Sequence, residues 1–398
     1  MNRIIALANI AEAQKELKTL RVDLAGIELM APKAIYRAIK IKDLRPVAAN
    51  ILKQEMLSIG GEAATSHGSI NLSVEKTDVL LLGTLKHFKY LTNKMKTHQF
   101  GLPVLAIDLE AILRNYDSTP MPMQIGNKLF DFSQHTFVMG ILNFTPDSFS
   151  DGGKYLSVDQ AVEHAEQMLR DGADIIDIGG ESTKPGSNSI SLEEEISRVI
   201  PVVKKVFQST NAVISIDTTK AEVARQAIAA GAAMVNDISG LRADTNMATV
   251  VAEEKVPVCL MHIKGTPKGM QINPVYSDMM AEIGDYLLEG LAIAKRAGIL
   301  HEKLIVDPGI GFGKTVEQNL EIFNKLRELK VLGCPLLIGP SRKNVIGKVL
   351  DLPVDDRLEG TAALVALSIV NGANLVRVHD VKQMQRVVKM IDAILRRK

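Results

Sequence analysis

The chain has 398 residues, enough for one large domain together with a smaller one. The formal net charge is only +1, so we have no reason to expect nucleic acid or an anionic membrane as the main partner. Both cysteines, Cys259 and Cys334, lie in apolar runs, which indicates buried, reduced thiols. No apolar run reaches the length of a membrane span, and we therefore expect a cytoplasmic protein.

Residues 1–125 show a mixed pattern of their own. The segments at 45–61 and 85–98 have helical periodicity, and a short apolar run at 78–84 is typical of a strand. We interpret 1–125 as a small α/β domain of unknown function and its basic segment at 85–98 as a solvated helix face. The stretch "DSTPMPMQIG" (117–126) is rich in proline and polar residues, and we expect a linker over 126–136.

From residue 137 onward one unit repeats, because short aliphatic runs alternate with longer segments of helical periodicity. Eight such runs are present, at 137–143, 174–180, 212–218, 234–239, 257–262, 304–309, 335–340 and 375–380. Runs with little polar alternation are typical of strands covered on both faces, as in a parallel sheet. Eight βα units in roughly 250 residues predict a (β/α)8 barrel over residues 137–398. An open doubly wound sheet is the competing prediction, but no G-x-G-x-x-G follows the first strand.

Each predicted strand ends in polar residues. They are Asn143, Glu181, Thr183, Asp217, Asn236, Asp237, His262, Asp307, Ser341, Lys343, Arg377 and His379. In a closed barrel these ends meet at one mouth, where the reactive groups of such barrels lie. Helix capping alone could explain a single Asp or Asn, but not a lysine, two histidines and an arginine.

Several of these stretches resemble the dihydropteroate synthases, a family of pterin-binding barrels. The matching stretches, in family order, are "MGILNFTPDSFSDGG", "DIGGESTKPGS", "SIDTTKAEV", "VNDISG", "LMHIKGTPKGMQ", "VDPGIGFGK", "GPSRK" and "RVHDV". The resemblance implies a Mg²⁺-dependent transferase of folate biosynthesis. It would join p-aminobenzoate to 6-hydroxymethyl-7,8-dihydropterin diphosphate and release pyrophosphate. Residues 1–125 would make the chain a long form with an N-terminal extension.

The residue types suit this chemistry. A pterin has an alternating donor and acceptor edge, which Asp307 and Asn236 could match. Asp217 could stabilise positive charge on the methylene carbon, and we expect Asp217, Lys343 and Arg377 to be catalytic. The remaining expected contacts to the pterin diphosphate are Met261, Phe312 and His379.

The resemblance also implies further ligand contacts. Thr183, Pro185, Ser341 and Phe149 would hold p-aminobenzoate, and Asn143 would be a ligand of Mg²⁺. Sulfonamides are then expected inhibitors. A homodimer is expected only because related barrels often form dimers through their late helices.

Other residues are discounted, and two alternative functions are kept open. His164 and His301 lie away from the strand ends, and "GIGFGK" lacks the Walker spacing, so we expect its backbone beside the pterin. The first alternative is a methyltetrahydrofolate-binding methyltransferase barrel, which would need no cations for a diphosphate. The second is a non-catalytic pterin-binding scaffold. Phe144, Pro340 and Asn344 depart from the family pattern and put sulfonamide affinity in question.

Overall fold

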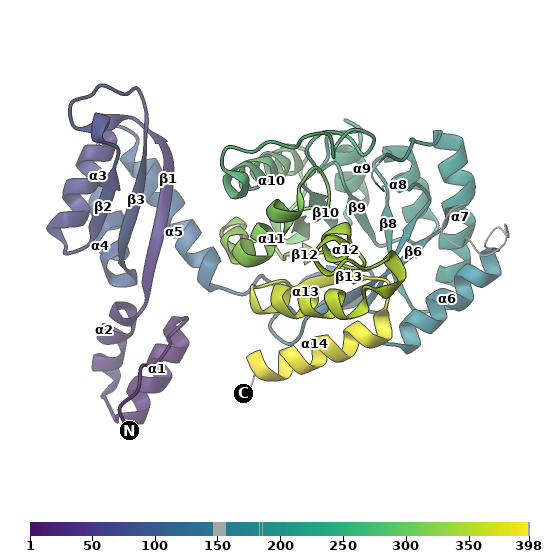
Figure 1. The fold of residues 1–398 in the computed structure, drawn as a ribbon, viewed down its shortest axis with the longest axis horizontal. Helices are drawn as coiled ribbons and strands as arrows, with labels where there is room; N and C mark the ends of the chain where they lie inside the picture. Colours follow the sequence, from purple (N-terminus) through teal and green to yellow (C-terminus); the bar gives the residue numbers. More distant parts are fainter. Residues whose placement is uncertain (146–156, 183, 185, 397–398) are drawn as a thin grey trace. The chain divides into compact units, whose positions relative to one another are not determined.

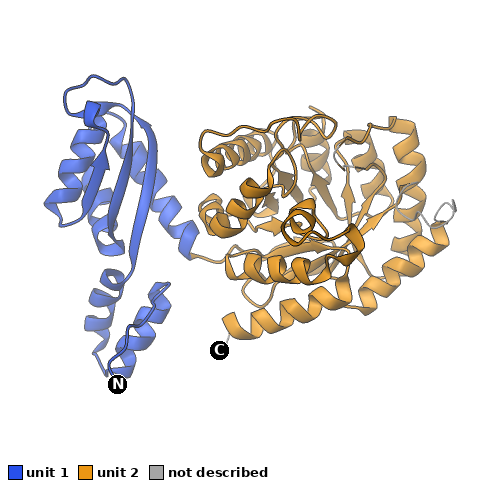
Figure 2. Ribbon diagram, viewed as in Figure 1, with its two compact units in different colours: residues 1–117 blue, residues 118–398 orange. Residues whose placement is uncertain are grey.

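A computed structural model describes residues 1–145, 157–182, 184 and 186–396. The chain divides into two compact units, residues 1–117 and residues 118–398 (Figure 2). Each unit has its own hydrophobic core. None of the described helices is both long enough and apolar enough to cross a membrane.

The first unit is an α/β domain around a three-stranded antiparallel sheet of order β1–β3–β2 (Figure 1). Its strands are β1 (Tyr36–Leu44), β2 (Glu62–Thr65) and β3 (Thr77–Thr84). Its helices are α1 (Ile10–Thr19), α2 (Leu24–Ala34), α3 (Pro46–Ser58), α4 (Leu85–Met95) and α5 (Leu102–Asp117). The expected small α/β domain is therefore present.

Alternation along β3 explains how this sheet acquires a buried face. Val79 and Leu81 are fully buried, whereas Asp78 and Leu80, which alternate with them, are exposed. Side chains of a strand alternate between its faces, so one face of the sheet packs against helices and the other meets solvent. Helices α3, α4 and α5 contribute the apolar partners on the buried face.

The second unit is the expected (β/α)8 barrel. Its strands are β6 (Phe137–Asn143), β7 (Ile175–Gly179), β8 (Val213–Asp217), β9 (Met234–Asp237), β10 (Val258–Met261), β11 (Leu304–Asp307), β12 (Leu337–Ile338) and β13 (Leu375–Val378). All eight are parallel, in the order β11–β10–β9–β8–β7–β6–β13–β12. A parallel bridge between Val306 and Leu336 joins the two ends of this order and closes the barrel.

Helices follow the strands and cover the outside of the barrel (Figure 1). They are α6 (Val158–Arg170), α7 (Leu192–Ser209), α8 (Ala221–Ala229), α9 (Met247–Glu254), α10 (Met279–Arg296), α11 (Val316–Lys325), α12 (Asn344–Leu350), α13 (Leu358–Val370) and α14 (Val381–Leu395). Local sequence sets several of their starts. Ser157 and Thr315 form capping boxes with Gln160 and Gln318, which satisfy free backbone N–H groups at the first turn.

The boundary between the units differs from the expected one. The predicted linker at 126–136 belongs to the barrel unit, which begins at residue 118. A hairpin of β4 (Met123–Ile125) and β5 (Lys128–Phe130) buries its apolar side chains against the amino-terminal ends of the barrel strands. The Pro-rich composition hid this role, because the apolar residues of a three-residue strand are too few to show periodicity.

Candidate active site at the barrel mouth

Side-chain alternation builds the site in layers inside the barrel. Each of the eight strands contributes one side chain to an apolar layer near the hairpin, namely Met139, Ile175, Val213, Met234, Cys259, Ile305, Leu337 and Leu375. Because side chains on one face recur every second residue, the next inward layer lies two residues further along each strand. That layer consists of Ile141, Asp177, Ser215, Asn236, Met261, Asp307, Gly339 and Arg377. The polar side chains thus converge directly above the apolar layer.

Arg377 lies at the centre of a hydrogen-bonded network in this layer. Its Nε donates to Asp177 Oδ2 at 2.6 Å, and its Nη2 donates to Asp217 Oδ2 at 2.7 Å. Asn236 Nδ2 also donates to Asp177 Oδ2, at 3.1 Å. The expected residues Asp217, Asn236 and Arg377 are therefore brought together, and two carboxylates fix the plane of one guanidinium.

Asp177 is a site residue that the strand-end rule missed. It lies in the middle of β7, is fully buried, and one of its oxygens, Oδ1, has no hydrogen-bond partner in the described part of the chain. A lone carboxylate inside a strand that is otherwise apolar was the available signal. Such a residue is rarely buried without a charged partner.

Burial and neighbouring charges set the protonation of Asp217. Loss of solvation raises its pKa to about 7, Arg377 opposes this shift, and the charge of Asp177 adds to it. Asp217 is thus placed to change its protonation state near neutral pH, which is typical of functional sites.

Asp307, Phe312 and Lys343 form the opposite side of the site. Burial raises the pKa of Asp307 to about 6, and its Oδ1 accepts a 2.7 Å hydrogen bond from the backbone N–H of Gly309. Lys343 Nζ lies 4.4 Å from the centre of the Phe312 ring. Burial and the charge of Arg377 lower the pKa of this lysine to about 8. The expected residue Met261 is buried in the same apolar cluster as Phe312.

The loop after β11 approaches the backbone of its neighbour so closely that it needs glycine. Gly309 has φ of +69°, and a Cβ atom there would lie 2.0 Å from His262 O. Gly313 has φ of +67°, and a Cβ would lie 2.4 Å from Lys264 O. This is the "GIGFGK" stretch, and its glycines bring the loop against the segment after β10.

Two further strand-end residues pair with each other. Ser341 Oγ lies 2.9 Å from His379 Nδ1 and accepts the backbone N–H of His379 at 3.1 Å. Burial, with Arg377 and Arg342 nearby, lowers the pKa of His379 to about 3, so its imidazole is neutral at pH 7. Arg342 forms a two-pronged ion pair with Asp380, at 3.0 and 2.7 Å, which already engages its charge.

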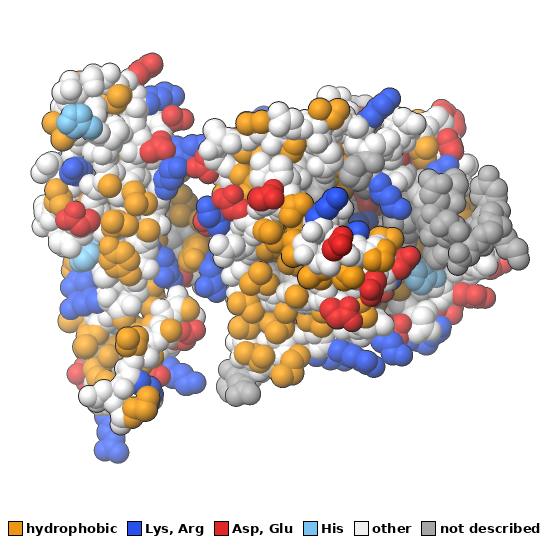
Figure 3. All heavy atoms as spheres, viewed as in Figure 1, with side chains coloured by type: hydrophobic (Ala, Val, Ile, Leu, Met, Phe, Trp, Pro, Cys, Tyr) orange, Lys and Arg blue, Asp and Glu red, His pale blue; other side chains and the backbone are white. Residues whose placement is uncertain are grey.

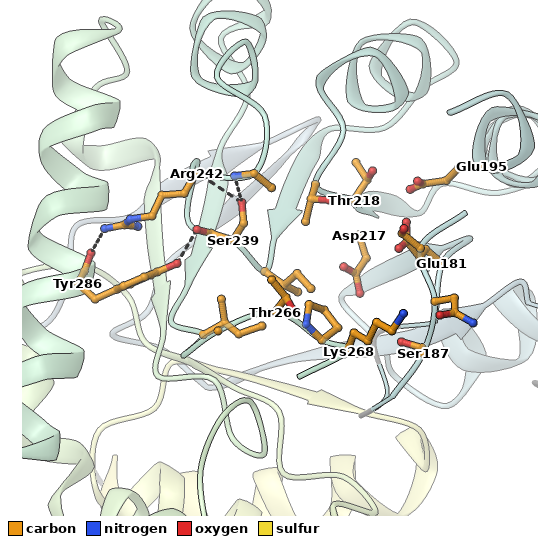
Figure 4. Close-up of a pocket in the computed structure, with 18 residues that line it drawn as sticks. Glu181, Ser187, Glu195, Asp217, Thr218, Ser239, Arg242, Thr266, Lys268 and Tyr286 are labelled. Atoms are coloured by element: carbon orange, nitrogen blue, oxygen red, sulfur yellow. Dashed lines mark hydrogen bonds between the residues drawn. The ribbon is translucent and has the colours of Figure 1, made fainter. Parts of the chain in front are cut away.

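A cavity of about 830 Å³ opens beside Asp217 at the ends of β7 to β10 (Figure 4). Glu181, Glu195 and Thr218 line one part of it, and Arg242 and Tyr286 line another. Lys220 Nζ donates to Glu181 Oε2 at 2.6 Å and also pairs with Glu195, so these acidic groups are partly neutralised. The volume is in the range of small-molecule sites.

Asn143 lies at the end of β6, in register with Gly179 and, through it, with Asp217. A Cβ atom on Gly179 would lie 3.7 Å from both Asn143 Oδ1 and Asp217 Oδ2, so the glycine leaves space between these oxygens. Among the described residues, no group of three or more His, Cys, Asp or Glu side chains could hold a metal ion. The side-chain oxygen of Asn143 is an uncharged donor of the kind that can serve as one ligand of a Mg²⁺ ion whose other ligands are water and phosphate oxygens.

Three expected contacts to p-aminobenzoate, Thr183, Pro185 and Phe149, lie outside the described residues. His164 and His301 lie away from the site, as expected: His164 is on α6, and His301 contacts Cys334. Both cysteines are free and buried.

Comparison with known proteins identifies the family. A family model described as "Pterin binding enzyme" matches residues 139–379. A dihydropteroate synthase of Clostridium beijerinckii is 52% identical over 276 residues, which are 69% of this chain and all of that protein.

The whole chain also has a relative. A probable bifunctional folylpolyglutamate synthase/dihydropteroate synthase of Halobacterium salinarum is 37% identical over 385 residues, 97% of this chain and 46% of that protein. The first unit therefore lies within this match.

Solved structures agree with the sequence matches. A Yersinia pestis dihydropteroate synthase in complex with a sulfonamide drug gives a TM-score of 0.66 at 42% identity, over 69% of this chain and 99% of that one. A Clostridium difficile dihydropteroate synthase solved in the presence of pteroic acid gives 0.64 at 48% identity, over 67% of this chain and all of that one. The chain belongs to the pterin-binding enzyme family, as a long form of the dihydropteroate synthase type.

Proposed function

We propose that this chain is a dihydropteroate synthase, which condenses 6-hydroxymethyl-7,8-dihydropterin diphosphate with p-aminobenzoate to give 7,8-dihydropteroate and pyrophosphate. The observation that carries the proposal is the inward polar layer, in which Arg377 is fixed by Asp177 and Asp217 and faces Asp307 and Lys343. This set of groups suits a heterocycle with a polar edge and an anionic leaving group.

The pterin ring would lie within this layer. Asp307 and Asn236 would accept and donate hydrogen bonds along its edge, and Lys343 would donate to its carbonyl or ring nitrogen. Met261 and Phe312 would contact the faces of the ring, because both belong to one buried apolar cluster. A ligand without the matching edge would leave these buried polar groups unpaired, at a cost of about 1–3 kcal/mol each.

The reaction breaks the bond between the methylene carbon and the diphosphate oxygen, and the electron pair leaves with pyrophosphate. The amine nitrogen of p-aminobenzoate then bonds to that carbon and loses a proton. Asp217 would stabilise the positive charge that develops on the carbon, provided that it is ionised. Arg377 would neutralise charge on the leaving oxygens.

His379 would assist as a hydrogen-bond donor rather than as a cation, because burial keeps its imidazole neutral. Ser341 Oγ accepts the His379 backbone N–H, so its own hydrogen can point to Nδ1 and leave the proton on Nε2. Asn143 would be the protein ligand of Mg²⁺, and that ion would supply further positive charge at the diphosphate.

Thr183, Pro185, Ser341 and Phe149 are proposed contacts to p-aminobenzoate. The sulfonamide complex of the Yersinia pestis relative supports sulfonamides as inhibitors of this chain as well. Phe144, Pro340 and Asn344 are the positions at which we expect affinity to differ.

We also propose a homodimer and a cytoplasmic location. Exposed apolar side chains lie on α13 (Leu367, Val370) and on α14 (Met390, Ile394), and Figure 3 shows hydrophobic side chains gathering on this face. Burying such a patch between two copies would remove it from water. Light scattering on the purified chain would test the dimer, and a monomeric mass at micromolar concentration would contradict it.

The proposed cytoplasmic location is supported by the two free, buried cysteines, which suit a reducing compartment.

The test of the activity uses the purified full chain with the dihydropterin diphosphate and Mg²⁺, with and without p-aminobenzoate. We expect one pyrophosphate and one dihydropteroate per turnover when both substrates are present. Tight pterin binding without product would instead favour the methyltransferase or scaffold alternative.

A further inference from the structure

Lys314 is a buried lysine that the proposed mechanism does not use. It follows the loop after β11 and is only 2% exposed. Its Nζ lies 2.9 Å from His262 Nδ1 and donates to Gly309 O at 2.9 Å and to Phe312 O at 3.0 Å. An ammonium group has three donors, so all three find an acceptor here. Burying this charge without such partners would be very unfavourable.

The groups that Lys314 holds are linked to two residues of the pterin pocket. Gly309, whose carbonyl accepts from Lys314, donates its backbone N–H to Asp307 Oδ1. Phe312, whose carbonyl also accepts from Lys314, places its ring against Lys343 Nζ. A shift of this loop would therefore change both the edge-binding carboxylate and the ring that flanks the ligand.

The same loop also has neutral anchors, which offer a matched comparison. Tyr276 donates its hydroxyl to Gly313 O at 2.8 Å, and Asn319 Oδ1 accepts from Gly311 N at 2.7 Å. These bonds hold the loop in place without adding charge to the pocket. Of these three side chains, Lys314 alone both hydrogen-bonds to the loop and can carry a positive charge.

We propose that Lys314 is a positioning residue for pterin binding: it holds the loop 309–313 and His262 in place and keeps a positive charge behind Asp307. This inference deepens the proposed function and rests on it, because it concerns the pterin pocket of that enzyme. Lys314 does not contact the reacting atoms and is not a catalytic residue.

The charged groups around Asp307 and Lys314 set the direction of the expected pH effect. Asp307 is faced by Lys343, Lys314 and Arg377, all of which lower its pKa against the effect of burial. Burial lowers the pKa of Lys314 to about 7; Asp307 opposes this shift, whereas Lys343 and Lys264 add to it, so Lys314 is charged in the acid range in which Asp307 titrates. Removing the Lys314 charge would raise the pKa of Asp307, so a higher pH would be needed to ionise the edge-binding carboxylate.

The experiment compares full-length Lys314→Met with wild type. We expect the KM for the dihydropterin diphosphate to rise about tenfold, because the edge-binding carboxylate and the loop that flanks the ring both lose their support. The KM for p-aminobenzoate should change much less. The acid limb of kcat/KM should move to higher pH, and kcat/KM at pH 5 should fall by up to about tenfold relative to wild type, as for the loss of a nearby opposite charge.

Two controls separate charge from packing. Tyr276→Phe removes a neutral anchor of the same loop and should leave the acid limb in place. Lys325→Met removes an exposed lysine paired with Glu321 on α11 and should behave as wild type. If Lys314→Met does not fold, Lys314→Gln keeps hydrogen-bond donors, lacks the charge and should show the same shift of the acid limb.

Activity of the wild type tests the proposed function, and the ratio of variant to wild type tests the role of Lys314. If the wild type does not turn over, the affinity for pteroic acid, measured by calorimetry across pH, gives the same comparison. An unchanged pterin KM or affinity and an unchanged acid limb in the Lys314 variant would overturn the inference. A loss of active fraction alone, with wild-type KM and pH profile, would also overturn it.

Discussion

At the scale of single residues, the site depends on an imbalance of charge around Arg377. Two buried carboxylates, Asp177 and Asp217, share one guanidinium, and Asp177 Oδ1 has no partner within the described residues. Excess negative charge is costly in a buried site, and it is one reason why the pKa of Asp217 is raised to about 7. The site therefore keeps a carboxylate that is poorly neutralised until positive charge develops on a substrate.

Replacement of Asp217 tests this role directly. Asp217→Asn keeps the size and a hydrogen-bond acceptor for Arg377, so we expect the fold and pterin binding to persist. Loss of the charge should lower kcat by about a hundredfold or more, as for other groups that stabilise transition-state charge. Steady-state kinetics would check the loss of kcat, and calorimetry would check that pterin binding persists. An unchanged kcat would remove Asp217 from the mechanism.

The pH dependence of the wild type follows from the same groups. Asp217 and Asp307 must be ionised in the proposed mechanism, and their pKa values are raised to about 7 and about 6. We expect kcat/KM to fall as the pH is lowered through this window. A flat profile between pH 5 and 8 would contradict these assignments.

Asp177→Asn should move this profile in the opposite direction from the Lys314 variant. Removing the Asp177 charge takes away one cause of the raised pKa of Asp217, so the acid limb should shift to lower pH. Stability should change little, within about 1 kcal/mol, because one carboxylate still pairs with Arg377. Thermal melting with a pH–rate profile would check this, and a shift to higher pH would contradict it.

At the scale of elements, alternation along the strands explains more of the site than the strand ends do. The resemblance and the strand ends together predicted Asn236, Asp307 and Arg377 correctly as parts of one mouth. Asp177 was missed, because it lies in the middle of its strand, four residues before Glu181, the first polar residue after that strand. Lys314 was missed as well, since nothing in a Gly-rich loop shows that its lysine turns inward and donates to three acceptors.

The loop after β11 should tolerate no side chain at its first glycine. Gly309→Ala would place Cβ 2.0 Å from His262 O at φ of +69°. We therefore expect this substitution to lower the free energy of unfolding by at least about 2 kcal/mol. Gly269→Ala is the matched control, because no heavy atom lies within 4 Å of its added Cβ. Chemical denaturation would compare the two, and equal stabilities would contradict the close approach.

At the scale of the whole molecule, the eightfold repeat made the barrel predictable, whereas the domain boundary was not. The hairpin of β4 and β5 has too few residues for a periodic signal, yet it covers the apolar layer at the barrel base. The function of the first unit could not be predicted either, since its sequence has no motif that specifies a chemistry.

Truncation would test the boundary. A chain beginning at Ser118 keeps the hairpin and should fold and release pyrophosphate. A chain beginning at Asp131 lacks Met123, Ile125 and Phe130. Burial of each of these side chains stabilises the fold by about 1.5–3 kcal/mol, so this shorter chain should be unstable. Equal thermal stability of the two truncated chains would contradict the role of the hairpin.

The most direct test of the account is a crystal structure of the full chain with pteroic acid. We predict that the pterin ring lies in the inward polar layer, with its edge at Asn236 and Asp307 and its faces against Met261 and Phe312. A ring bound in the part of the cavity lined by Arg242 and Tyr286, or bound anywhere else outside this layer, would contradict it.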